Sequence, residues 1–100
     1  MVRHIILWNL KEEYSDSEKE KIKKNIKSEL EGLKGKIPGL LDIKVHISGL
    51  SSSTADLMLE TSFENAQALK GYAVNPEHVH VADTFVRPFT ALRSCLDFEE

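Results

Sequence analysis

The chain has 100 residues, the length of one domain, because a chain of this size buries about two-thirds of its unfolded surface around a single core. Its 13 basic and 16 acidic residues give a formal charge of -3, which offers no positive surplus for a nucleic-acid backbone, so no nucleic acid is expected as a partner. The single cysteine, Cys95, excludes an intrachain disulfide and a cysteine-rich zinc site, and it suits a reducing cytoplasm.

Residues Val2 to Leu10 form the first predicted strand, and both of its alternating sets are largely apolar. One set comprises Val2, His4, Ile6, Trp8 and Leu10, and the other comprises Arg3, Ile5, Leu7 and Asn9. An antiparallel strand with one wet face does not show this pattern, so both faces should be covered. The segment is too short to span a bilayer and is soon followed by charged residues, so neither a membrane nor a targeting role is expected.

A long amphipathic helix follows from Ser15 to Ile37. Ser15 and Glu18 have the spacing of a capping box, and Pro38 with Gly39 should end the helix. Apolar residues recur at helical intervals among lysines and glutamates, namely Ile22, Ile26, Leu30, Leu33 and Ile37. The interleaved charges indicate a solvated helix face.

Two strands of a hairpin come next, over residues 41–48 and 56–63, joined by a serine-rich turn. The sets expected to face inward are Leu41, Ile43, Val45 and Ile47 in the first strand and Leu57, Leu59, Thr61 and Phe63 in the second. Ser62 or Glu64 should then begin a short helix that runs through Tyr72 and ends at Asn75 and Pro76.

Pro76 suits the first turn of another short helix, which should run through Val79 and Ala82. The last predicted strand covers Phe89 to Phe98. The order β-α-β-β-α-β predicts a ferredoxin-like α+β fold, a four-stranded antiparallel sheet with helices on one side. The other sheet face, which carries Ile5 and Leu7, would leave apolar surface in water, so we expect a two-fold homodimer joined sheet to sheet.

Several segments resemble the stress-responsive dimeric α+β barrel (Dabb) family, which includes the plant olivetolic acid cyclase: RHIILWNLK, LKGKIPGL, DLMLETSFE, ALKGYAVNPEHV and LDFE. The resemblance covers almost the whole chain as a single domain and implies a dimer whose sheets pair into a barrel. In the cyclase, a histidine of the first strand and the motif Y-x-x-x-P-x-H line a pocket. The matching residues here are His4, Tyr72 and His78. The chain departs from the pattern at Asn75, where the family often has histidine, and at Leu30, where the cyclase has tyrosine.

These three residues suit proton transfer beside a carbonyl group, as in a cyclase or isomerase. An imidazole titrates near neutral pH, so His78 is the candidate base. Tyr72 and His4 are candidates for orienting that base or for donating to a developing enolate oxygen. This chemistry requires no cofactor, and none is predicted. No metal site is predicted either, because His78 and His80 diverge on a helix, and Cys95 is expected to be inert packing.

Two classes of function stay open on this reading. The first is a protein that holds a small apolar compound with a carbonyl group between sheet and helices, with or without catalysis. The second is a non-catalytic, stress-associated structural or assembly protein, in which Tyr72 and His78 only fix a turn. A binder should contain a cavity of about 300 Å³ or more beside these residues. A structural protein should fill that space with Leu30, Trp8 and Phe85.

Overall fold

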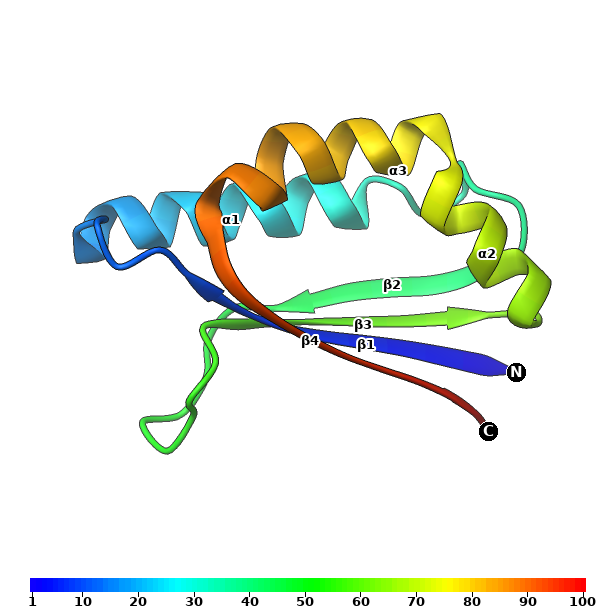
Figure 1. The fold of residues 1–100 in the computed structure, drawn as a ribbon, viewed down its shortest axis with the longest axis horizontal. Coiled ribbons are helices and arrows are strands. Elements are labelled where there is room, and N and C mark those ends of the chain that lie inside the picture. The colour runs from blue at the N-terminus through cyan, green and yellow to red at the C-terminus, as the bar shows by residue number, and fades with distance from the viewer.

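A four-stranded antiparallel sheet in the order β2-β3-β1-β4 carries every helix on one face, and its other face is bare (Figure 1). This arrangement comes from a computed structural model that describes residues 1–100. The strands are β1 (Val2–Leu10), β2 (Leu40–His46), β3 (Leu57–Phe63) and β4 (Thr90–Glu99). The helical segments are α1 (Asp16–Glu31), α2 (Ala66–Val74), α3 (Pro76–Val81), η1 (Ala82–Val86) and η2 (Arg87–Phe89). The ferredoxin-like prediction is confirmed, and no helix has the length and apolar character that a membrane crossing requires.

Strand β1 lies in the interior of the sheet between β3 and β4, and it supplies the helix-facing side with its even-numbered residues. All of these are buried: Val2, His4, Ile6, Trp8 and Leu10. Ile6 lies opposite Leu59 of β3 and Cys95 of β4. Most of the even-numbered set joins Ile26, Leu30 and other apolar side chains in one core cluster of 18 residues. His4 is therefore a polar side chain surrounded by core.

The bare sheet face carries an apolar strip formed by β1 and β4. The register pairs Ile5 with Leu96 and Leu7 with Ser94, so these side chains point away from the helices. Leu7 is 41% exposed, Leu96 63% and Leu92 67%. The first strand thus has two apolar faces, as its sequence predicts, and within one protomer only one of them is covered.

Helix α1 begins as predicted but ends earlier. The Ser15 side chain accepts from the Glu18 amide while the Glu18 carboxylate accepts from the Ser15 amide, which completes the capping box. The helix stops at Glu31 instead of Ile37, because Gly32 is followed by tighter turns such as the hydrogen bond from the Leu33 amide to the Leu30 carbonyl. These turns retain a nearly helical spacing, so Leu33 and Ile37 are still buried.

The inward register of β2 also differs from the prediction at its start. A bulge between Leu40 and Asp42 buries Leu40 and turns Leu41 outward, where it is 45% exposed. From Ile43 onward the predicted alternation holds.

The helical segment after Pro76 is longer than its sequence predicts. Helix α2 is capped by Asn65, whose side chain accepts from the Ala68 amide, and not by Ser62 or Glu64. Helix α3 then continues directly into the π-helical turn η1 and the short η2, which reach Phe89. This long run lies over the sheet beside α1 (Figure 1) and forms one wall of the site described next.

Candidate functional site

A chamber of about 180 Å³ lies between the sheet and the helices that follow β3. Its wall is mostly apolar and is formed by Ile6, Trp8, Leu30, Leu59, Leu69, Ala73, Ala82 and Val86. Its polar groups come from His4, Tyr72, His78, Thr90 and two arginines. The structure therefore brings His4, from the start of the chain, to the same cavity as Tyr72 and His78.

Tyr72 and His78 are held together by the turn between α2 and α3. Asn75 ends α2 and caps α3, with its side chain accepting from the Glu77 amide, and Pro76 occupies the first turn of α3. The departure from the family pattern at Asn75 thus has a local structural reason. The two rings stack with centroids 4.0 Å apart and planes inclined by 31°.

The polar ends of these two rings are buried without a partner in the protein. Neither the Tyr72 hydroxyl nor the His78 Nδ1 atom makes a hydrogen bond, although Tyr72 is only 1% exposed. An unsatisfied buried hydroxyl or ring nitrogen costs about 1–3 kcal/mol, so most buried polar groups find partners. These two atoms, side by side at the cavity, are free to form hydrogen bonds.

Burial also fixes the protonation states of the pair. It raises the pKa of Tyr72, which therefore remains a hydrogen-bond donor at neutral pH. Burial lowers the pKa of His78, and the nearby positive charge of Arg87 lowers it further. The carbonyls of Ala73 and Tyr72 lie near the ring and partly oppose this shift, but neither forms a hydrogen bond with Nδ1. At neutral pH the site thus holds a neutral imidazole that can accept a proton beside a phenol that can donate a hydrogen bond.

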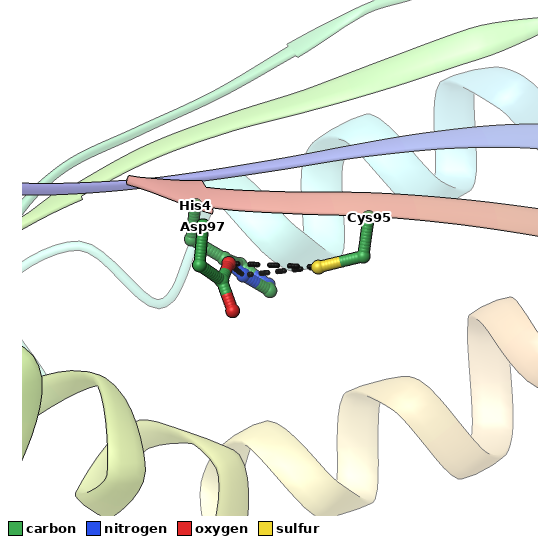
Figure 2. Close-up of side chains that lie close together, drawn as sticks. All are labelled: His4, Cys95 and Asp97. Atoms are coloured by element: carbon green, nitrogen blue, oxygen red, sulfur yellow. Dashed lines mark hydrogen bonds and ion pairs between the residues drawn. The ribbon is translucent and has the colours of Figure 1, made fainter. Parts of the chain in front are cut away.

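His4 is oriented by a residue that the sequence analysis did not single out. Its Nδ1 atom is hydrogen-bonded to the Asp97 carboxylate on the neighbouring strand β4, and the Cys95 sulfur lies 3.7 Å from the same nitrogen (Figure 2). A carboxylate only accepts, so Nδ1 donates, and in the neutral ring Nε2 is then the acceptor nitrogen. The His4 ring lies 6.1 Å from the Tyr72 ring, between centroids. Asp97 could have been found only through the strand register, which sets it opposite His4.

His4, Cys95 and Asp97 also form the one group in the chain with the ligand types of a metal site. Their nitrogen, sulfur and oxygen atoms all lie within 4.8 Å of one another, and such a mixed set can bind zinc. Here the carboxylate and the imidazole satisfy each other. Partial burial and the Asp97 charge raise the pKa of the Cys95 thiol, which keeps it protonated at neutral pH. His80, by contrast, points away from the chamber and packs against Phe85.

The chamber is smaller than the volume expected of a binding protein, at about 180 Å³ instead of 300 Å³. Leu30 and Trp8 form part of its wall, as expected if the space were being filled, but Phe85 does not reach it. An apolar cavity of about 150 Å³ is large enough to hold a benzene ring. The space therefore suits a compound of one ring or a short branched chain.

The chain is similar in sequence and fold to known proteins over almost its whole length. The family model described as Stress responsive A/B Barrel Domain matches residues 2–100. A dimeric protein of unknown function with a ferredoxin-like fold from Bacteroides fragilis is 29% identical, with a TM-score of 0.91 over 99% of this chain and 95% of that one. No curated protein matches the sequence.

More distant structures share the fold. A dimeric ferredoxin-like protein of unknown function from Thermobifida fusca is 18% identical, with a TM-score of 0.75 over 97% of this chain and 88% of that one. The hydroxynitrile lyase of Passiflora edulis is also 18% identical, with a TM-score of 0.77 over 97% of this chain and 90% of that one.

Proposed function

The chain belongs to the stress-responsive A/B barrel family, and from that membership and the chamber's geometry we propose that it binds a small apolar ketone and moves a proton beside the carbonyl group. The observation that carries the proposal is the pair of unpartnered polar atoms, the Tyr72 hydroxyl and His78 Nδ1, at one cavity. The fold is compatible with catalysis, since one structural neighbour is a hydroxynitrile lyase.

His78 acts as the base in this proposal. Its Nδ1 atom takes a proton from the carbon next to the carbonyl, and the electron pair of that C–H bond becomes the carbon–carbon double bond of an enolate. The charge that develops on the carbonyl oxygen is stabilised by a hydrogen bond from the Tyr72 hydroxyl. The imidazolium of His78 then returns the proton at a different carbon atom of an extended enolate, which completes an isomerisation. Alternatively, the enolate carbon bonds to a second carbonyl carbon of the same molecule, which closes a ring, and the alkoxide formed from that carbonyl takes the proton from the His78 imidazolium.

His4 and Asp97 support the same step from the sheet. Asp97 holds His4 Nδ1 as a donor, so Nε2 is available to accept from a ligand or a bound water. The walls are apolar, which strengthens each of these polar contacts by excluding water.

A homodimer is part of the proposal. The apolar strip that includes Leu7 and Leu96 is uncovered in one protomer, and the relatives from Bacteroides fragilis and Thermobifida fusca are described as dimeric. The same strip is the observation that favours the second candidate function, a non-catalytic assembly protein.

We place the protein in a reducing cytoplasm, where its one cysteine stays a free thiol.

Deuterium exchange on a simple ketone tests the proton transfer. Methyl isoamyl ketone fits the size of the chamber, and its protons beside the carbonyl exchange with heavy water slowly unless a base acts on them. The wild-type protein should accelerate that exchange, followed by NMR, and the variant His78→Asn should lose at least about 100-fold of the acceleration. Binding is followed in parallel by the fluorescence of Trp8, the only tryptophan, which lines the chamber.

The matched control is His80→Asn, which changes an exposed histidine outside the chamber two residues further along the same helix. That variant should exchange deuterium like the wild type. If the ketone binds but its exchange is not accelerated, the protein is a binding protein and not a catalyst of proton transfer. Absence of binding, with a folded dimer, would favour the assembly function.

A further inference from the structure

The mouth of the chamber carries two positive charges and no negative one. Arg87 of η2 and Arg93 of β4 both line the chamber, while none of its lining residues is an aspartate or glutamate. This is unexpected in a chain of net charge -3 with 16 acidic residues. The side chains that line the chamber thus include two cations and no anion.

The two arginines differ in how far their charge is already compensated. Arg87 is ion-paired with Asp83 one helical turn earlier, and Arg3, on the bare sheet face, is paired with Glu60 and Glu100. Arg93 is the remaining arginine, and it has no ion pair. Its guanidinium lies near the Cys95 thiol, which is protonated at neutral pH and offers no charge.

The nearest acidic group on the same strand face is already occupied. Asp97 lies four residues beyond Arg93 and is hydrogen-bonded to His4. A guanidinium presents parallel N–H groups that match the two oxygens of a carboxylate. Arg93 therefore offers an open site for an anion at the edge of a cavity whose inner polar groups, Tyr72 and His78, also lack partners.

From this arrangement we infer that the ligand is a small keto acid, with its carbonyl group at Tyr72 and His78 and its carboxylate on Arg93 at the mouth. The inference rests on the proposed function and adds the substrate class. An inner keto group and an outer carboxylate, joined by a short apolar chain or a single ring, suit a chamber of about 180 Å³ with apolar walls.

A matched pair of ketones tests the inference. Levulinate and methyl isoamyl ketone share the same methyl ketone and chain, and they differ only in a carboxylate that replaces an isopropyl group. The Trp8 fluorescence should report binding of levulinate about tenfold tighter than that of the neutral ketone. The preference should weaken when NaCl is raised from about 0.05 M to about 0.5 M, because salt screens an exposed charge pair.

The variant Arg93→Gln should bring the ratio of the two affinities close to one, and Arg93→Lys should leave an intermediate ratio because it keeps the charge but loses the paired donors. Lys24→Gln removes the same charge from the exposed face of α1 and should preserve the wild-type ratio. Thermal melting verifies that each variant is folded.

The possible failures are distinguishable. Binding of the neutral ketone as tight as or tighter than levulinate would overturn the keto-acid inference and leave the proposed function standing. A tenfold preference that persists in Arg93→Gln would also overturn it, since another group would then hold the carboxylate. Failure of both ketones to bind would overturn the proposed function together with the inference.

Discussion

Removing the Tyr72 hydroxyl should make the empty protein more stable. The ring of Tyr72 packs against Phe63, His4 and His78, with centroid separations of 5.1, 6.1 and 4.0 Å, and the change Tyr72→Phe keeps all of these contacts. It removes only a buried hydroxyl that has no partner. Since such a group costs about 1–3 kcal/mol, the variant should gain about 1 kcal/mol of unfolding free energy, or roughly 4–8 °C in melting temperature.

The measurement is urea and thermal unfolding of the wild type and Tyr72→Phe without ligand, followed by ketone binding to both. The variant should bind methyl isoamyl ketone about 3- to 10-fold more weakly, because the ligand loses one hydrogen bond. Tyr14→Phe is the control, since Tyr14 lies outside the chamber and its hydroxyl interacts with Glu13. A loss of stability in Tyr72→Phe would refute the reasoning, because it would mean that the hydroxyl has a structural partner in the fold.

Three further predictions concern the dimer, the pH response and one turn. Leu7→Asp should dissociate the dimer in sedimentation velocity, because it would bury an unpaired charge, whereas Leu50→Asp, at a loop residue 80% exposed, should not; an intact Leu7→Asp dimer would contradict the proposed interface. The native pKa of His78 is lowered from its ordinary 6.5, so the unfolded chain takes up a proton first as pH falls. Stability measured by urea unfolding should therefore drop as pH falls below about 6.5, and His78→Asn should lose this component; an identical pH slope in the variant would contradict the burial of His78. Gly39→Ala should lower the unfolding free energy by about 2 kcal/mol or more, because φ is +79° and the new Cβ would lie 2.4 Å from another side chain; Gly35→Ala, with φ +83° and open space, should lose about half as much, and equal losses would rule out the clash.

The fold could be predicted from the sequence because each element carries a strong local signal. The capping box at Ser15, the alternation in β3 and the Asn75–Pro76 stop all lie within a few residues of the structure they specify. The two-faced pattern of β1 predicts both the helix-facing core and the uncovered strip. These signals depend on neighbouring residues and need no knowledge of long-range contacts.

The features that could not be predicted depend on register and on the ends of elements. The bulge between Leu40 and Asp42 makes Leu40, and not Leu41, the first inward residue of β2, and no residue type there signals it. Helical turns after Gly32 keep the periodicity of α1 while the helix itself has ended.

In the site, too, some residues could be predicted from local sequence and others depend on strand register. Tyr72 and His78 lie on one short motif, so their proximity could be predicted from the sequence. The hydrogen bond between His4 and Asp97 joins residues 93 positions apart, and it depends on the exact pairing of β1 with β4. Arg93 reaches the chamber through the same pairing, which sets it opposite Trp8. A sequence alone gives no reason to single out either residue.

A crystal structure of the dimer with methyl isoamyl ketone bound would test the central claim most directly. The ketone oxygen should lie within hydrogen-bonding distance of the Tyr72 hydroxyl, with a carbon beside the carbonyl facing His78 Nδ1. A ketone found only outside the chamber, with Tyr72 and His78 bonded to protein groups, would contradict the account.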